Sequence, residues 1–135
     1  INDTSTWYGI EWNENGNVTK IDLSYLNLSG WFNANNFPEL QDLNLDGNDI
    51  SMLAVSGCAD LVSLSCMANN LSAISVNNCS NLQNLDCSFN QIGNLNLSNM
   101  SQLVELNCYG NSINNLNLNG ATALQTVRCG NTLKC

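Results

Sequence analysis

Residues 82–123 contain one pattern twice, and this pair settles the architecture. LQNLDCSFNQIGNLNLSNMSQ at residues 82–102 is followed without a gap by LVELNCYGNSINNLNLNGATA at residues 103–123. Both blocks are 21 residues long and read L-x-x-L-x-C-x-x-N-x-I-x-x-L-x-L. Self-similarity at a fixed period is typical of repeat architectures. We therefore expect a solenoid in which each block forms one turn.

The same period extends from this pair in both directions. Two further blocks precede it, at residues 40–60 and 61–81; a looser block with one extra residue, 18–39, opens the series, and a partial block, 124–135, closes it. The expected organisation is an N-terminal cap at residues 1–17 and a solenoid of about six coils at residues 18–135.

Equivalent apolar positions of the blocks are predicted to form columns inside the coil. The two clearest columns are Val18, Leu40, Leu61, Leu82, Leu103 and Leu124, then Ile21, Leu43, Leu64, Leu85, Leu106 and Val127. Burying the apolar side chains of one block gives roughly 10 to 20 kcal/mol, whereas ordering its backbone costs roughly 20 to 40 kcal/mol. One block cannot fold alone, so we expect right-handed coils stacked at a strand spacing of ~4.8 Å.

An asparagine column, Asn48, Asn69, Asn90 and Asn111, follows the first half of four blocks. A side-chain amide there can satisfy backbone groups exposed by the bend and bridge to the next coil. The rest of each block is rich in Asn, Ser and Gly, which are poor helix formers. The sequence therefore predicts a mostly β fold, with short strands on the concave side, extended segments on the convex side and little or no helix.

The pattern L-x-x-L-x-L-x-x-N-x-L resembles the signature of leucine-rich repeats, and it covers residues 18–135. In each block the second half repeats the first, as in the nested bacterial class named IRREKO. The stretch WYGIEW…NGNVTKIDLSYLNLSG also resembles the cap and first repeat of extracellular leucine-rich-repeat proteins. It differs in lacking their paired cysteines and in carrying Leu26 where the ladder Asn is expected. The resemblance implies a bacterial, secreted or cell-surface binding module.

Residues 1–17 do not fit the repeat, but Trp7, Tyr8, Ile10 and Trp12 are too apolar for a disordered tail. Asn15-Gly16 favours a hairpin turn, and an open solenoid edge needs a cover, which predicts a cap. The alternative is a Trp/Tyr platform for carbohydrate. Because the chain begins at Ile1 rather than Met, we expect that any secretion signal has been removed.

The charge balance narrows the choice of partners. The chain has three basic and eleven acidic residues, a net charge of −8. Such a surface repels phosphate backbones and anionic lipid headgroups, which excludes nucleic acid and membrane surfaces as expected partners. No apolar run approaches the ~18 to 20 residues of a membrane span, so we expect a soluble chain without membrane insertion.

The seven cysteines are interpreted as small apolar side chains. Cys66, Cys87, Cys108 and Cys129 fall in the column of Leu23 and Leu45, while Cys58 and Cys79 share a column with Met100 and Ala121. In-register parallel side chains have poor disulfide geometry, which leaves Cys129 with Cys135 as the one plausible disulfide. Without histidine or a C-x-x-C pair, no zinc site is expected.

Catalysis is not expected either. The chain has no histidine to serve as a base and no glycine-rich phosphate loop after a strand. Five carboxylates share one predicted face, but a narrow solenoid gives them no deep pocket. We predict a non-enzymatic chain without cofactors. The carboxylates are Asp22, Asp42, Asp46, Asp86 and Glu105.

Positions beside the strand leucines are predicted to point outward on the concave face. Tyr25, Met67, Phe89 and Tyr109 form an apolar strip there, and aromatic anchors with a polar rim are typical of protein interfaces. The alternative is scattered surface apolar residues, which are common. The predicted ligand contacts are Lys20, Asp22, Tyr25, Asp42, Asn44, Asp46, Met67, Asp86, Phe89, Glu105, Tyr109 and Arg128.

These observations favour a monomeric binding module for a protein or glycan. A structural spacer within a larger surface protein is the alternative from another class. The opposite face carries small uncharged residues such as Ser75, Asn77, Asn96 and Asn117, which we interpret as a solvated side. An ice-binding role ranks below both, because threonine is scarce there.

Overall fold

The computed structural model describes residues 8–130, and in this range it contains eleven short strands and no helix. The prediction of a mostly β solenoid is confirmed. No segment of the described range is a helix that could cross a membrane. The strands are β1 (Ile10–Trp12), β2 (Val18–Asp22), β3 (Ser29–Asn33), β4 (Asp42–Asn44), β5 (Asp49–Ala54), β6 (Ser63–Ser65), β7 (Asn84–Asp86), β8 (Asn94–Asn96), β9 (Glu105–Asn107), β10 (Asn115–Asn117) and β11 (Thr126–Arg128).

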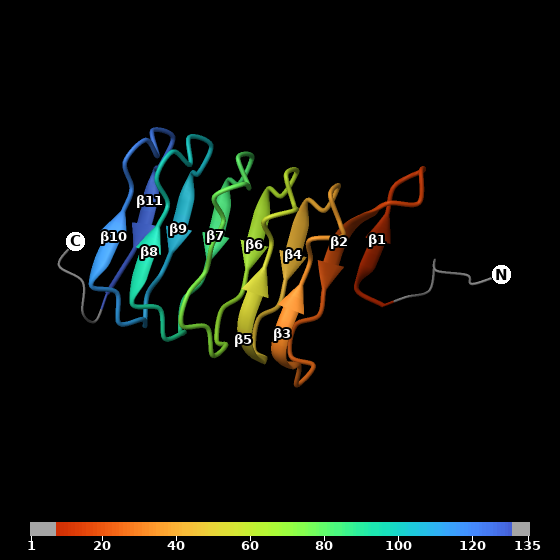
Figure 1. Cartoon of the computed structure of the whole chain (residues 1–135), viewed down its shortest axis with the longest axis horizontal. Coiled ribbons are helices and arrows are strands. Elements are labelled where there is room, and N and C mark those ends of the chain that lie inside the picture. Colours follow the sequence, from red (N-terminus) through yellow and green to blue (C-terminus); the bar gives the residue numbers. More distant parts are fainter. Residues whose placement is uncertain (1–7, 131–135) are drawn as a thin grey trace.

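Seven strands form one sheet, which we call the long sheet, in the order β1-β2-β4-β6-β7-β9-β11 (Figure 1). From β2 onward all neighbours are parallel and in the register that the repeat predicts, with Leu64 opposite Leu85 and Leu85 opposite Leu106. Six parallel strands are joined by five complete turns. The predicted count of about six coils is slightly too high, because the partial last block contributes only β11 to the described stack.

The apolar columns face inward, as predicted. Leu64, Leu85 and Leu106 are 1%, 2% and 1% exposed. Because every second residue of a strand points to the same side, the neighbours of each leucine are on the outer face. The core lies between the long sheet and the opposite side of the coil, and it runs through the whole stack.

Each ladder asparagine is buried and ties its coil to the preceding one. The Asn90 amide donates to the carbonyl of Cys66 in the previous coil (2.9 Å) and to that of Cys87 in its own coil (3.2 Å), while its Oδ1 accepts from the amide of Leu71 (3.0 Å). Asn48, Asn69 and Asn111 make equivalent bonds. The bridge runs backward, so the first coil, which has no parallel coil before it, can carry Leu26 instead.

The other side of the coil forms a second layer, seen in front of the long sheet in Figure 1. It contains two separate parallel pairs, β3 with β5 and β8 with β10. Residues 71–76 between these pairs form no strand, although Leu71, Ile74 and Val76 are buried. The predicted extended segment on this side is thus a strand in four coils and not in the third.

The described part of the predicted cap, residues 8–17, covers the edge of the long sheet. β1 pairs antiparallel with β2 through a turn in which Gly16 has a φ of +79°. The side chains of Asn13 and Asn17 both donate to the carboxylate of Glu39, which holds the hairpin against the end of the first coil. The predicted hairpin is present. Trp7 lies outside the described residues.

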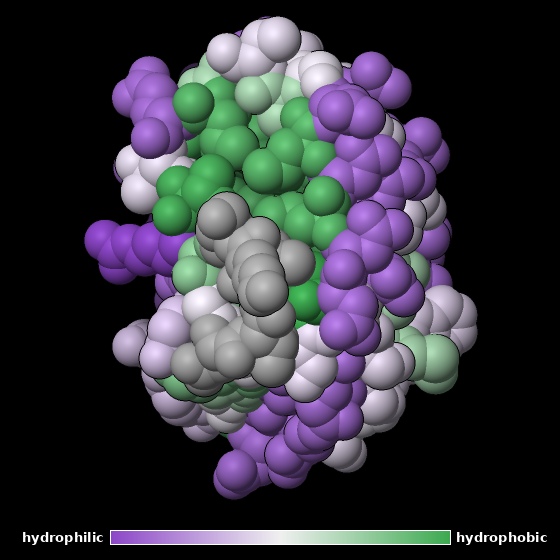
Figure 2. Space-filling model, turned by 90° about the vertical axis from the view of Figure 1, so that its left-hand side faces the viewer, coloured by the Kyte–Doolittle hydropathy of each residue, from purple (hydrophilic) through white to green (hydrophobic). Residues whose placement is uncertain are grey.

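At the opposite end the columns are less deeply buried. Leu116, Leu118 and Leu124 are half-buried, and Val127 is 40% exposed. Figure 2 looks at this end and shows hydrophobic residues gathered on its surface. The inward positions of the repeat therefore remain apolar as far as the last described strand, although their side chains are more exposed there.

Candidate recognition surface

The outward residues of the long sheet form two polar columns, which we call the polar face. In-register pairing places each residue beside its counterpart on the next strand. None of these side chains is buried, as predicted for positions beside the inward leucines. The first column is Lys20, Asp42, Ser63, Asn84, Glu105 and Thr126; the second is Asp22, Asn44, Ser65, Asp86, Asn107 and Arg128.

A hollow of about 370 Å³ lies on the polar face over β6, β7, β9 and β11. We call it the groove. Its polar lining comes from Ser63, Ser65, Asn84, Asp86, Glu105 and Asn107, with Thr126 and Arg128 at one end. The two serines, both on β6, have the smallest of these side chains. The groove is shallow and open to solvent.

Several groove side chains are held in place by hydrogen bonds. Asp86 accepts from the backbone amide and hydroxyl of Ser88 with Oδ1, and from the Asn107 side-chain amide with Oδ2 (3.0 Å). Asn107 Oδ1 in turn accepts from the amide of Tyr109 (3.3 Å). Polar groups of the groove thereby hold the start of the turn that carries Tyr109.

Three of the predicted ligand residues also have structural bonds. Asp46 Oδ1 accepts from the hydroxyl of Ser65 (2.6 Å) and the amide of Met67 (2.8 Å), which ties two coils together. Asp22 accepts from Ser24 within its own turn, and Asn44 accepts from the amide of Asp46. These side chains shape the polar face as well as lining it.

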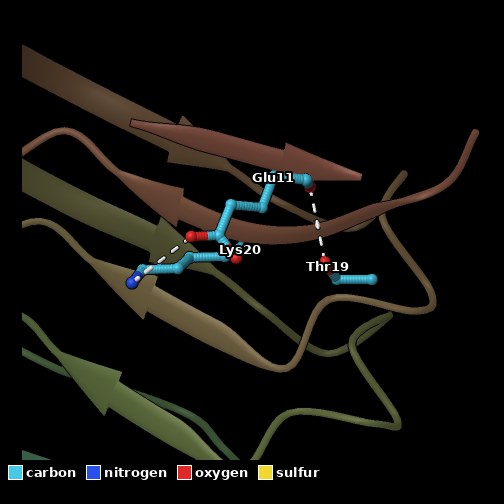
Figure 3. Close-up of polar contacts among 3 residues, drawn as sticks. All are labelled: Glu11, Thr19 and Lys20. Atoms are coloured by element: carbon cyan, nitrogen blue, oxygen red, sulfur yellow. Dashed lines mark hydrogen bonds and ion pairs between the residues drawn. The ribbon is translucent and has the colours of Figure 1, made fainter. Parts of the chain in front are cut away.

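Lys20 is tied to the cap (Figure 3). Its Nζ lies 3.8 Å from a carboxylate oxygen of Glu11, and the neighbouring Thr19 hydroxyl donates to the Glu11 carbonyl (3.4 Å). Both partners are well exposed, so the ion pair contributes little to stability. The two cationic residues of the polar face, Lys20 and Arg128, lie on its first and last parallel strands.

The predicted aromatic strip is divided in the structure. Phe89 and Tyr109 follow adjacent strands, and their rings make an edge-to-face contact with centroids 5.5 Å apart. Tyr25 follows β2, three strands from β7 in the sheet order. Met67, after β6, is half-buried. Of the four predicted residues, Phe89 and Tyr109 form a compact aromatic pair, in the turns that follow the groove strands β7 and β9. We call these turns the rim; neither ring lines the groove itself.

The turns after β2, β4, β6, β7 and β9 each have a left-handed backbone at one equivalent position. That position has φ of +55° at Tyr25, +66° at Gly47, +54° at Ala68, +54° at Phe89 and +70° at Gly110. At that position a residue with a Cβ destabilises the fold by about 1 to 2 kcal/mol relative to glycine. The rings of Tyr25 and Phe89 lie over the glycine of the following coil, where a Cβ would meet them at 2.2 and 2.7 Å. Each exposed ring therefore also covers backbone.

The five described cysteines other than Cys129 are free and buried. Burial is the main cause that raises the pKa of Cys66 well above its ordinary value of 9.0, with further contributions from the charges of Cys87, Asp46 and Asp86. Burial and the neighbouring Cys58 raise the pKa of Cys79 to about 11. These thiols are protonated core side chains at neutral pH.

The predicted disulfide between Cys129 and Cys135 involves a residue outside the described range, so it stays a prediction. Within residues 8–130, no three or more His, Cys, Asp or Glu side chains are grouped so that they could hold a metal ion. The described buried side-chain nitrogen and oxygen atoms all have hydrogen-bond partners.

Sequence reasoning missed an apolar patch on the second layer. Trp31 on β3 and Met52 on β5 lie opposite each other and are 61% and 58% exposed. They border a shallow hollow that also includes Ala73 and Ile74. Aligning residues 29–33 with residues 49–54 would have revealed the patch, but β5 has one extra residue, Ser51, where the register shifts between Gly30 and Trp31, and this obscures the alignment.

Comparison of the chain with models of known families and with curated proteins gave no match. The geometry of the polar face and its rim is therefore the basis for assigning a function.

Proposed function

We propose that this chain is a non-catalytic recognition module of the leucine-rich-repeat type, right-handed, that binds a protein or glycan on its polar face. The observation that carries the proposal is the exposed pair Phe89 and Tyr109, 53% and 41% exposed, in the turns that follow two strands of the groove. Phe89 is kept in a left-handed conformation where two other coils use glycine. An exposed aromatic residue in an unfavourable backbone conformation is a sign of selection for something other than stability.

The spacing of the repeat and the asparagine ladder support the leucine-rich-repeat assignment. In that class the concave strands are the usual ligand face, which would correspond to the polar face. The absence of histidine from the sequence supports a non-catalytic role. The cap-like N-terminal hairpin supports placement outside the cell, secreted or on a bacterial surface.

A structural spacer is the second candidate, and one observation favours it. The rings of Tyr25 and Phe89 lie over glycines of the next coil, and Asp22, Asp46 and Asp86 cap turns. All of these contacts would stabilise the solenoid even if its role were only to hold the neighbouring parts of a larger protein apart. The two candidates differ in whether the exposed rings contact anything outside the chain.

The test replaces Phe89 and Tyr109 with Ser together. Protein and glycan arrays are probed with the labelled chain and the double variant. We expect the module to lose its ligand, with a melting temperature lower by no more than ~5 °C, because an aromatic pair contributes about 0.5 to 1.5 kcal/mol. The matched control is Trp31→Ser with Met52→Ser, which removes a similarly exposed pair from the second layer. If the double variant binds the ligand as well as the control variant does, the polar face is not the ligand face.

A further inference from the structure

We propose that the groove over β6, β7, β9 and β11 binds a neutral oligosaccharide. This inference deepens the proposed function and rests on it, because it names the ligand class for the same face. Four features support it: the chemistry of the lining, the order of its side chains, the aromatic rim and the charge of the chain.

The lining offers hydrogen-bonding groups and no apolar pocket. Hydroxyls, side-chain amides and carboxylates make up its outward side chains, with the guanidinium of Arg128 at one end, whereas Leu64, Leu85 and Leu106 beneath them are 1% to 2% exposed. A protein partner places its affinity in apolar or aromatic anchors that fill pockets, and the groove has none to receive them. A sugar needs the reverse arrangement, many donors and acceptors spread over a shallow surface.

The polar groups alternate in a way that suits hydroxyls. In-register pairing places the Asn84 amide beside the Glu105 carboxylate, and Asp86 beside Asn107. A hydroxyl group both donates and accepts, so one hydroxyl can donate to a carboxylate and accept from the neighbouring amide. Two such pairs on adjacent strands would receive hydroxyls at two positions of an oligosaccharide.

Part of the lining is already ordered without a ligand. The two oxygens of Asp86 are held from opposite sides by Ser88 and by Asn107, and the Ser65 hydroxyl is held by Asp46. Side chains that are fixed before binding lose little conformational entropy when they engage a ligand. Asn84 and Glu105 are exposed and keep hydrogen-bonding capacity for that ligand.

The rim supplies the apolar contact that sugars use. Phe89 and Tyr109 follow β7 and β9, the two strands at the centre of the groove, with ring planes 69° apart. Edge-to-face packing leaves part of a ring face uncovered, and aromatic faces attract the C–H groups of a sugar ring as they attract other partly positive groups. An oligosaccharide crossing the strands would lie with its hydroxyls on the groove and its C–H face on these rings.

The charge of the chain selects among sugars. The net charge of the chain is −8, and in the groove the carboxylates of Asp86 and Glu105 outnumber the one cation, Arg128. The face therefore repels sulfated or uronic-acid sugars. A neutral oligosaccharide meets no such repulsion. A lysine-rich peptide would also be attracted, but it would leave the fixed amides and hydroxyls of the groove without a role, so we treat it as a rival outcome of the test.

The experiment screens the chain on an array of neutral oligosaccharides and measures hits by isothermal titration calorimetry. Probes include cello-, manno-, xylo- and chitohexaose, with a hexagalacturonate and hexalysine for comparison. We expect binding to at least one neutral probe and none to the galacturonate. Asn84→Ala with Glu105→Ala, two exposed positions, should weaken binding at least tenfold. The matched control, Asn94→Ala with Asn115→Ala on the second layer, should change it less than twofold.

The outcomes separate this inference from the proposed function. If no neutral sugar binds, or if sugar binding is the same in the groove variant, the inference is overturned. If hexalysine binds through Glu105 and the sugars do not, the ligand is a basic peptide and the inference is overturned. In either case, a protein ligand that depends on Phe89 and Tyr109 would leave the proposed function standing. If no ligand of any class binds the polar face, both the inference and the proposed function are wrong.

Discussion

The two layers of this solenoid share one 21-residue period, yet they differ in continuity. The long sheet runs unbroken from β1 to β11, whereas the second layer consists of two separate pairs with a strandless third coil between them. Inward side chains are buried on both sides, including Leu71, Ile74 and Val76 in the strandless segment. Apolar burial alone therefore places the coils but does not make a continuous sheet.

The asparagine ladder also distinguishes the two layers. Asn90 on the long-sheet side bonds to backbone groups of two coils, and it is buried. The second layer has asparagines as well, but Asn96 and Asn117 bond only within their own turns, to residues two positions later. A side chain that bridges two coils adds a bond between them, whereas one that closes its own turn does not, so β8 and β10 are joined by backbone bonds without a side-chain ladder.

The largest effect expected is alkaline unfolding. An unfolded thiol ionises near pH 9, while burial raises the pKa of the folded thiols, that of Cys79 to about 11. The folded state thus holds more protons, so the thiol contribution to stability is complete below about pH 8 and is lost as pH rises toward the folded pKa values. Five free thiols at about 1.4 kcal/mol per pH unit each give a slope of up to ~7 kcal/mol per unit.

Urea unfolding at pH 8, 9.5 and 10.5 measures this slope. Cys58 and Cys79 lie in the turns beside the second layer, so Cys58→Ala with Cys79→Ala should remove about two-fifths of it. The remainder belongs to the thiols behind the long sheet, Cys66, Cys87 and Cys108. A free energy of unfolding that stays level from pH 8 to pH 10.5 would contradict the buried thiol columns.

The next effect compares Asn90→Ala with Asn96→Ala, the same change on opposite layers of one coil. Asn90→Ala leaves the amide of Leu71 and carbonyls of two coils without partners, at a cost of roughly 3 to 5 kcal/mol. Asn96→Ala removes one exposed turn bond and should cost less than ~1 kcal/mol. Chemical denaturation of both variants provides the measurement. Equal losses would mean that the ladder does not distinguish the layers.

The smallest effect compares two glycines. At Gly110 a Cβ would lie 2.7 Å from the Phe89 ring and φ is +70°, so Gly110→Ala should destabilise by about 1 to 2 kcal/mol. At Gly93, just before β8, no atom lies within 4 Å of the place that an added Cβ would take, and Gly93→Ala should be neutral or stabilising by up to ~1 kcal/mol. Thermal unfolding of the pair suffices. A loss at Gly93 comparable with that at Gly110 would show that both layers need their glycines equally.

Much of the fold could be predicted because the repeat encodes it position by position. The leucine columns, the Asn ladder and the Asn15-Gly16 hairpin each correspond to a local rule, and each is present. The direction of the ladder could not be predicted, since a pattern does not say whether an amide reaches forward or back. The division of the aromatic strip was also missed, although Tyr25 and Phe89 hold the same position in the first and fourth blocks and so lie three strands apart. Which rings touch depends on side-chain directions in the folded turns, and the repeat pattern does not specify these.

The order of amino acids was enough to show which residues face inward. Apolar side chains that recur every 21 residues can all be buried together if each block forms one coil and the coils stack. Which layer is continuous, and which outward residues form the groove, became clear only from the folded coil. Those features depend on bonds between residues about 20 positions apart, such as Asn107 with Asp86 and Ser65 with Asp46. Such bonds form only when the coils stack, so they cannot be inferred from the sequence of either block taken alone.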